Sequence, residues 1–164
     1  MTISQMMLPE FDQEMASSRK MLAALPDGNF DYKPHEKSMT LGRLAGHVAE
    51  MPGWAMVTLT QDKLEITPDM KPTTATSREQ ILGLFDQQMT QAREVLAGTS
   101  DEKMMANWSL VFNGQTAFTL PRVAVIRGMV MNHMIHHRAQ LGVYLRLNNL
   151  PIPGMYGPSG DEKM

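Results

Sequence analysis

Asn132-His133-Met134-Ile135-His136-His137-Arg138-Ala139-Gln140 is the stretch that organises this sequence, because it holds three of the five histidines. It lies within residues 121–147, whose pattern predicts one long helix with Pro121 in its first turn. His133 and His137 are four residues apart, so on a helix they project from the same face, one turn apart. His136 is turned by roughly 100° and should face elsewhere. Two stacked imidazoles of this kind can both direct a nitrogen at one cation.

A cation needs at least a third ligand, and the best candidate is His47. This residue lies mid-way along a second helical segment, residues 40–61, at the border of its apolar stripe. His133 and His137 also fall within an apolar stripe, formed with Ile126, Val130, Leu141 and Tyr144. Buried imidazoles cost free energy unless their polar atoms are satisfied, and a shared cation satisfies all three. A hydrogen-bonded histidine cluster without metal is the alternative.

The donor set indicates the kind of metal site. Three neutral imidazoles suit Zn²⁺ or Ni²⁺, and also Fe²⁺ or Mn²⁺, with further coordination positions left to water or substrate. Glu50 lies one turn from His47, where it can reach the metal, a bound water or a ligating ring, or stay a solvated surface carboxylate. Arg138 is expected in a structural salt bridge or hydrogen bond, and His35, in a polar loop, is expected to be solvated.

The remaining chain predicts an all-α fold. Apolar stripes over residues 3–25, 40–61, 77–97 and 121–147 predict a four-helix bundle. Residues 62–76 are expected to form a long ordered loop. Residues 107–112 and 115–119, joined by Asn113-Gly114, predict a short β-hairpin before the last helix. Residues 148–164 are rich in proline and glycine and predict an extended C-terminal tail on a single domain, residues 1–164.

Composition excludes several functions. The net charge of −2, without a basic block, does not favour nucleic acid. The absence of cysteine excludes disulfides, cysteine–zinc sites and a protein thiolate, so any thiol chemistry must use an external thiol. No secretory signal and no bilayer-length apolar run are found, which favours the cytoplasm. Met129, Met131 and Met134 lie on different faces of one helix, which suggests a homodimer, unless hairpin and tail cover that surface.

Two sets of motifs resemble the DinB-like family. The first set is His133-x-x-x-His137-Arg138-x-Gln140-x-x-x-x-Tyr144-Leu145-Arg146 followed by Pro151-x-Pro153-Gly154-x-Tyr156-Gly157. The second is Pro34-His35-x-Lys37-Ser38-x-Thr40-Leu41-Gly42, which leads to His47. The resemblance covers most of the chain, from the first helix to Gly157. This sequence differs in having Ala139 where a glycine is common.

The resemblance implies an up-down-down-up four-helix bundle, a long crossover after the second helix and frequent homodimers. It implies a divalent metal, often nickel or zinc, held by three histidines, which map onto His47, His133 and His137. Some members of the family are transferases or isomerases that use low-molecular-weight thiols such as bacillithiol or mycothiol, and many have no known activity. The expected function is a metal-dependent thiol transferase with a small-molecule substrate. A metal-dependent hydrolase and a non-catalytic, metal-stabilised stress-response or binding module are the alternatives.

Overall fold

The computed structural model describes residues 1–162, which are mostly helical with a small three-stranded sheet. The first three long helices each start where a side chain caps them. Thr2, Thr40 and Ser77 each accept a hydrogen bond from a backbone N–H three residues later, which satisfies a donor that the helix leaves free. The elements in chain order are α1 (Ile3–Ala23), α2 (Leu41–Thr60), β1 (Lys63–Ile66), α3 (Arg78–Gly98), α4 (Asp101–Met105), β2 (Asn107–Phe112), β3 (Gln115–Pro121), α5 (Arg122–Val125), the π-helix η1 (Ile126–Asn132) and α6 (His133–Leu147).

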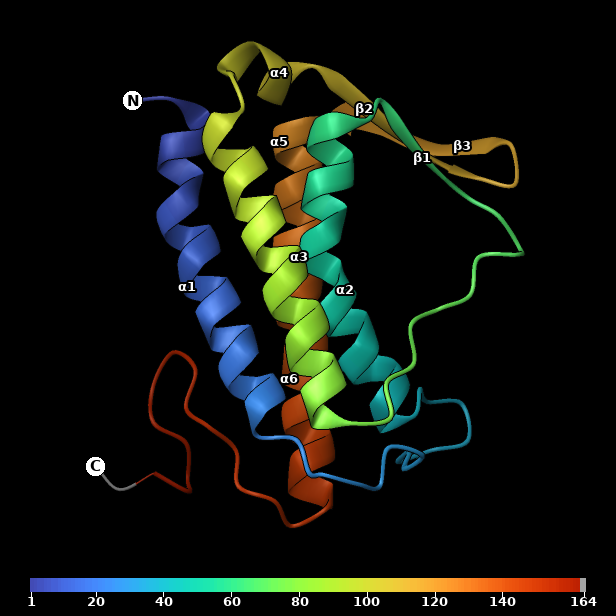
Figure 1. Cartoon of the computed structure of the whole chain (residues 1–164), viewed down its shortest axis with the longest axis vertical. Helices are drawn as coiled ribbons and strands as arrows, with labels where there is room; N and C mark the ends of the chain where they lie inside the picture. The colour runs from blue at the N-terminus through green and yellow to red at the C-terminus, as the bar shows by residue number, and fades with distance from the viewer. Residues whose placement is uncertain (163–164) are drawn as a thin grey trace.

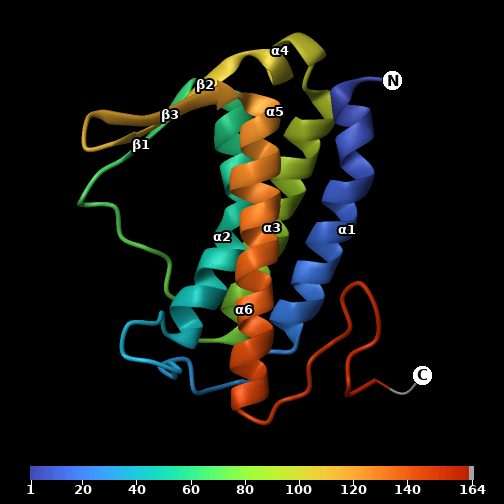
Figure 2. The same cartoon turned by 180° about the vertical axis from the view of Figure 1, so that it is seen from behind.

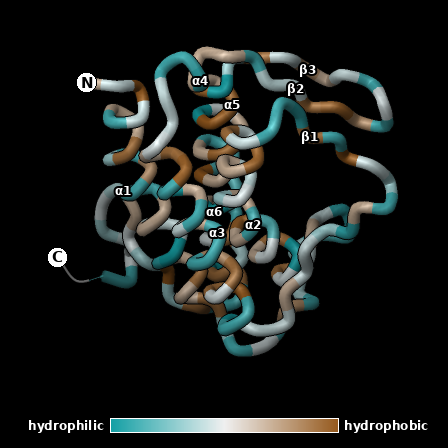
Figure 3. The backbone as a smooth tube through the Cα atoms, turned by 45° about the horizontal axis from the view of Figure 1, so that its top comes forward, coloured by the Kyte–Doolittle hydropathy of each residue, from teal (hydrophilic) through white to brown (hydrophobic). Residues whose placement is uncertain are grey.

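Four long helical segments lie side by side (Figure 1 and Figure 2). In Figure 1, α1 descends from the N-terminus, α2 and α3 both ascend, and the continuous segment α5–η1–α6 descends again. Short hydrophobic and hydrophilic stretches alternate along the tube of these helices (Figure 3), as expected where one face of each helix is buried. The shared core contains fully buried side chains from each segment, including Phe11, Val48, Phe85 and Leu145.

The sheet corrects the prediction for residues 62–76, which was an ordered loop without a strand. β1 lies in that connection and pairs in parallel with β2, and β2 pairs antiparallel with β3. At the β2–β3 turn, Asn113 and Gly114 have φ values of 48° and 78°, the left-handed backbone that a tight hairpin turn requires. The sheet packs on the helices through Trp108, Leu110 and Val125, which form a second small core. An all-α class is therefore too narrow a description.

The last helical segment also differs from the prediction. Pro121 ends β3 rather than opening the helix, and the seven residues of η1 form a π-helix immediately before His133. π-Helical turns are rare and often occur at functional sites. At the start of the segment, the buried Arg122 holds the junction between β3 and α5, because its guanidinium donates to the Thr58 carbonyl at 2.9 Å and to Asp62 at 2.7 Å. The short helix α4 was not predicted, and α1 ends at Ala23 rather than at residue 25.

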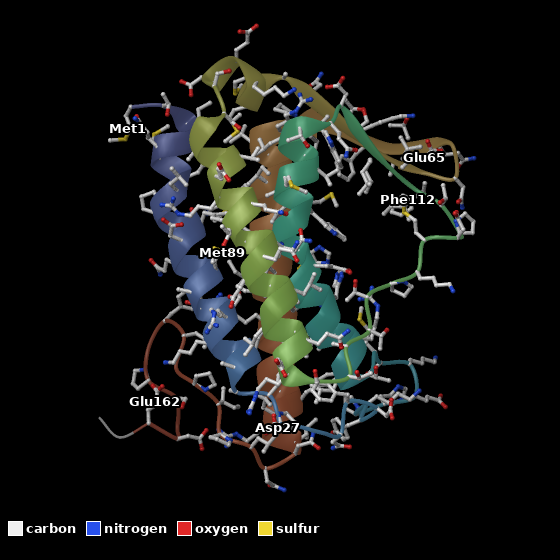
Figure 4. All side chains as sticks on the ribbon, viewed as in Figure 1. Met1, Asp27, Glu65, Met89, Phe112 and Glu162 are labelled. Atoms are coloured by element: carbon white, nitrogen blue, oxygen red, sulfur yellow. The ribbon has the colours of Figure 1, made fainter. Side chains whose placement is uncertain are left out.

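Residues 148–162 run without helix or strand beside the lower half of α1 (Figure 4, where Glu162 is labelled). Asp161 pairs with Arg146 at 2.6 Å, and Glu162 accepts hydrogen bonds from the Gly154 N–H at 2.8 Å and from Lys20 at 3.2 Å. Residues 163 and 164 of the predicted tail lie outside the described residues. Within residues 1–162, no helix combines the length and the apolarity needed to cross a lipid bilayer.

Candidate metal centre

Three histidines from two facing helical segments meet inside the molecule. His47 comes from the middle of α2, His133 is the first residue of α6, and His137 follows one turn later. One nitrogen from each ring can be chosen so that all three lie within 4.8 Å of one another. The ring centroids are 4.6 Å apart for His133–His137, 4.8 Å for His47–His137 and 5.2 Å for His47–His133. The structure therefore brings together the three residues that the sequence singled out.

Each ring is held at Nδ1 by an oxygen acceptor. The His47 Nδ1 lies 2.8 Å from Glu50 Oε1, and the His137 Nδ1 lies 2.7 Å from Gln140 Oε1. The His133 Nδ1 lies 3.2 Å from the Met129 carbonyl. Carboxylate and carbonyl oxygens accept hydrogen bonds, so the simplest assignment places a proton on all three Nδ1 atoms.

The Met129 carbonyl lies in the π-helix, where the backbone bonding differs from that of a regular α-helix. In a regular α-helix this carbonyl would accept the backbone N–H of His133, four residues later. Here the His133 N–H bonds to the Val130 carbonyl instead. The Met129 oxygen accepts the imidazole N–H of His133 instead. The irregular turn thus orients a ring of the cluster.

With Nδ1 protonated, each Nε2 carries a lone pair, and two of these lone pairs face each other. The Nε2 atoms of His133 and His137 are 2.8 Å apart. Two acceptors repel at this distance unless they share a proton or a cation. Because metal–nitrogen bonds are about 2.0–2.1 Å long, ring nitrogens on one ion lie about 3–4 Å apart. The 2.8 Å separation is slightly shorter than that range and equals a hydrogen-bond length, so the two rings would move slightly apart to share an ion. The donor set of three imidazoles, with one nitrogen from each within 4.8 Å of the others, fits a divalent cation.

A hydrogen-bonded cluster without metal needs a different arrangement of protons. The His137 Nε2 would have to donate to His133, which leaves the His137 Nδ1 as an acceptor. The Gln140 amide would then have to be reversed so that its NH₂ group donates to that nitrogen. Measuring the metal content distinguishes the two arrangements.

The electrostatic environment keeps two rings neutral, the form in which histidine binds metals. Burial lowers the pKa of His137 to about 4, against a hydrogen bond to Gln140 that raises it. Burial also lowers the pKa of His133 from its ordinary value. For Glu50, burial raises the pKa, but hydrogen bonds from His47 and Thr73 and the charge of Arg43 outweigh it, so the pKa is lowered. At neutral pH an ionised Glu50 thus faces the Nδ1–H of His47.

Two cavities border the cluster, each at a different histidine. His47 and Glu50 line one of about 360 Å³, together with Arg43, Trp54, Val57, Leu64, Ile66, Met70, Lys71 and Pro72. His137 and Gln140 line another of about 280 Å³, together with Lys37, Ser38, Met39, Leu44 and Tyr144. The histidines therefore border space in which small molecules can bind.

The other two histidines are not part of the group whose ring nitrogens converge. His136 is exposed, with its ring centroid 4.9 Å from that of His137. His35 is exposed in its loop, where its Nδ1 accepts the Lys37 N–H at 3.1 Å. The roles of Gln140 and of the Met129 carbonyl as acceptors for the His137 and His133 rings were not predicted from the sequence. Gln140 had a detectable signal, because it follows His137 by three residues and so shares its helix face.

Arg138 has the structural role that was predicted, because it joins the buried Glu14 and Ser18 to Tyr156, a largely exposed residue of the tail. Its guanidinium pairs with Glu14 at 2.7 Å and donates to Ser18 at 3.2 Å and to the Tyr156 hydroxyl at 2.6 Å. The Tyr156 hydroxyl also donates to Glu14 at 2.9 Å, and burial with this bond raises the pKa of Tyr156. These contacts join α1, α6 and the tail, and so fix the rotation of α6, on which His133 and His137 lie.

Comparisons with known proteins agree with this architecture. The model of the DinB family matches residues 1–163. A Bacillus subtilis protein, the uncharacterized protein YrdA, is 25% identical over 155 residues, which is 94% of this chain and 89% of that protein. The crystal structure of a DinB-like protein from Bacillus cereus has a TM-score of 0.72 at 25% identity and covers 94% of this chain and 98% of its own. The DinB-like protein YjoA of Bacillus subtilis shares the fold, with a TM-score of 0.68 at 18% identity, covering 93% of this chain and 99% of its own.

Proposed function

The chain belongs to the DinB family, and from this membership and the geometry of its histidines we propose that it binds one divalent transition-metal ion through His47, His133 and His137. The resemblance seen in the sequence is thereby confirmed. One observation carries the proposal: oxygen acceptors hold all three Nδ1 atoms, which leaves the Nε2 atoms for a ligand, and one nitrogen from each ring lies within 4.8 Å of the other two. The arrangement of the long helices supports the proposal that the fold is the up-down-down-up four-helix bundle of this family.

We propose zinc or nickel as the ion, with iron or manganese as alternatives, because neutral imidazoles suit all four. A divalent ion in this site supplies Lewis acidity, which lowers the pKa of a bound thiol below the ~8.5 of a free one. The chain's own residues hold the ligands in place: Glu50 orients His47, Gln140 orients His137, and the Met129 carbonyl orients His133.

The proposed activity is that of a transferase that joins a low-molecular-weight thiol to an electrophilic small molecule. Two cavities at the cluster support an open site over a closed structural one. The chain contains no cysteine, so no protein thiol competes with an external one. A metal-dependent hydrolase would use the same open site with water. A non-catalytic, metal-stabilised stress-response or binding module is the reading that remains if no turnover is found.

Metal content is the first test. The protein is purified without a metal-affinity tag and analysed by elemental mass spectrometry, and we expect about one divalent ion per chain. His47→Ala and His133→Ala should abolish binding. His136→Ala and His35→Ala are matched controls, because both side chains are exposed and lie outside the cluster. Equal metal content in all four variants would refute the ligand assignment.

Activity is the second test. The metal-loaded protein is screened with several small thiols and generic electrophiles, beside a panel of esters and amides. Thiol conjugation that disappears in His137→Ala supports the transferase. Cleavage of an ester or amide without any thiol would replace it with the hydrolase, and silence in both panels would favour the non-catalytic module.

We also propose a homodimer, on a different surface from the one that the methionines suggested. Met131 and Met134 are buried within the chain, and the half-buried Met129 packs against the sheet's small core. The exposed apolar side chains of α6 are Val143 and Leu147. Sedimentation that gives a monomer over a wide concentration range would refute the dimer. The cytoplasmic location expected from composition remains part of the proposal.

A further inference from the structure

We propose that the electrophilic substrate is an apolar molecule, and that it binds in the cavity of about 360 Å³ between α2, β1 and residues 70–72, called here the apolar cavity. The thiol then binds in the second cavity, of about 280 Å³, which is lined by His137. The inference rests on the proposed thiol transfer and adds to it a substrate class and a place for each substrate.

The walls of the apolar cavity favour an apolar ligand. Six of its ten lining side chains are apolar: Trp54, Val57, Leu64, Ile66, Met70 and Pro72. Burying apolar surface of a ligand against such walls is favourable by roughly 25 cal/mol per Å². His47 and Glu50 lie in the same lining, so a ligand held by these walls lies against the histidine cluster.

Trp54 connects the cavity to the cluster. Its ring centroid is 5.5 Å from that of His47, in an edge-to-face arrangement, and 5.9 Å from that of His133. The indole is only half-buried, which leaves part of it exposed toward the cavity that it lines. A flat apolar ligand can therefore stack on Trp54 and still reach the ligating nitrogens.

The strand β1 and the segment that follows residues 70–72 are held by contacts that need no ligand. Leu64 and Ile66 lie on β1, which is paired with β2 over its four residues. The neighbouring segment lies directly on α2, where the Ala75 N–H donates to the Gly42 carbonyl at 3.2 Å. A Cβ on Gly46 would approach the Thr73 carbonyl oxygen to 2.7 Å, so only glycine allows this close packing. Preformed, mostly apolar cavities with a few polar groups are the usual form of small-molecule sites.

The second cavity has a different chemistry. Lys37, Ser38, Gln140 and Tyr144 supply a cationic group, two hydroxyls and an amide beside His137. These groups suit the polar, hydrogen-bonding body of a low-molecular-weight thiol. The contrast between the two linings assigns the apolar partner to the apolar cavity and the thiol to the polar one.

The transfer balances without a further reactant. For an aryl or alkyl halide, the thiol releases its S–H proton to solvent, and a carbon–sulfur bond forms as the carbon–halogen bond breaks. The halide leaves with the electron pair of the broken bond, and nothing is oxidised or reduced.

A binding measurement tests the cavity independently of turnover. The zinc-loaded Trp108→Phe protein retains Trp54 as its single tryptophan, and this change removes no side-chain hydrogen bond, because the buried Trp108 Nε1 has no partner among the described residues. We titrate it with 2,4-dinitrotoluene, an apolar nitroaromatic that quenches indole fluorescence and has no leaving group. Saturable quenching is expected. Leu64→Gln should weaken binding about tenfold, the loss of one apolar side-chain contact.

Matched variants keep the test decisive. Met6→Gln makes the same kind of change at an exposed apolar site on α1, away from the cavity, and should leave the affinity unchanged. Ile66→Gln repeats the test at a second wall position in case Leu64→Gln does not fold, as judged by its circular dichroism melt. Quenching that does not saturate, or an affinity that neither cavity variant changes, overturns the inference.

Kinetics with 1-chloro-2,4-dinitrobenzene and a small thiol separate this inference from the proposed function. We expect Leu64→Gln to raise KM for the dinitrobenzene and Ser38→Ala to raise KM for the thiol. Conjugation with KM values that neither variant changes would overturn the substrate placement while the transferase stands. Saturable dinitrotoluene binding without any conjugation would refute thiol transfer and, with it, the role of the cavity as an electrophile site.

Discussion

Replacing Arg138 by methionine should destabilise the protein strongly. Arg138 and Glu14 are among the most buried charged side chains, with 2% and 5% of the side-chain surface exposed, and their atoms are 2.7 Å apart. Methionine fills much of the space but removes the positive charge. Glu14 would then remain buried with the Tyr156 hydroxyl as its one remaining side-chain partner. Breaking a buried pair from one side costs about 3–5 kcal/mol, because the other charge stays uncompensated.

Urea denaturation followed by circular dichroism measures this free energy of unfolding. The double variant Arg138→Met/Glu14→Leu removes both charges, so its loss of stability should be smaller than the summed losses of the two single variants. The difference should be about 1 kcal/mol or more, within the ~0.5–3 kcal/mol usual for coupled contacts. Arg19→Met is the matched control. It breaks a pair with Asp86 whose side chains are 48% and 41% exposed, so it should cost under about 1 kcal/mol.

Two outcomes would contradict the reasoning. If Arg138→Met cost no more than Arg19→Met, the buried pair would not hold α1 and α6 together. If the effects of Arg138→Met and Glu14→Leu were additive, the energy of the single change would come from packing rather than from an unpaired carboxylate. Metal content measured on the same samples should fall with Arg138→Met if the rotation of α6 positions the histidines.

Three further predictions concern the site and its surroundings. Gln140→Leu removes the acceptor that orients His137 and should weaken metal affinity about 10- to 100-fold in a chelator competition, whereas His136→Ala should not. His137 has a pKa of about 4 in the folded protein against an ordinary 6.5, so as the pH falls the unfolded chain takes up the proton first. The metal-free protein should therefore lose up to about 3 kcal/mol of unfolding free energy between pH 6.5 and pH 4. An unfolding free energy, measured with urea, that does not change over that range would contradict this. Gly46→Ala should cost about 1–3 kcal/mol, because its Cβ would press on the Thr73 carbonyl, whereas Gly83→Ala, with open space around it, should be neutral or slightly stabilising in the same thermal melts.

The sequence was most informative where the signal is local. The apolar stripes located the four long helical segments to within a few residues at most ends, because a helix is built from contacts three and four residues apart. The same spacing placed His133 and His137 on one face. The Asn113-Gly114 turn was also predictable from the sequence, since few residues other than asparagine and glycine adopt its positive φ values.

The sequence failed where an element depends on a distant partner. β1 has four residues and no distinctive pattern of its own, and it exists because β2, more than forty positions later, supplies its hydrogen bonds. Residues 126–132 were predicted as ordinary helix, and only the structure shows the π-helix and the contact of the His133 ring with the Met129 carbonyl. The burial of Arg138 against Glu14 is likewise a contact between α1 and α6 that periodicity cannot assign.

The sequence by itself thus determined the helical segments, the histidine pair on one helix face, the absence of a protein thiol and the resemblance to the DinB family. Tertiary structure decided which nitrogen of each ring is free, because Glu50, Gln140 and the Met129 carbonyl take the Nδ1 atoms only in the folded chain. It also decided that two unlike cavities flank the cluster. The physical reason is range: helical periodicity is set by neighbours along the chain, whereas the ring orientations and the cavities are set by packing between segments that only folding brings together.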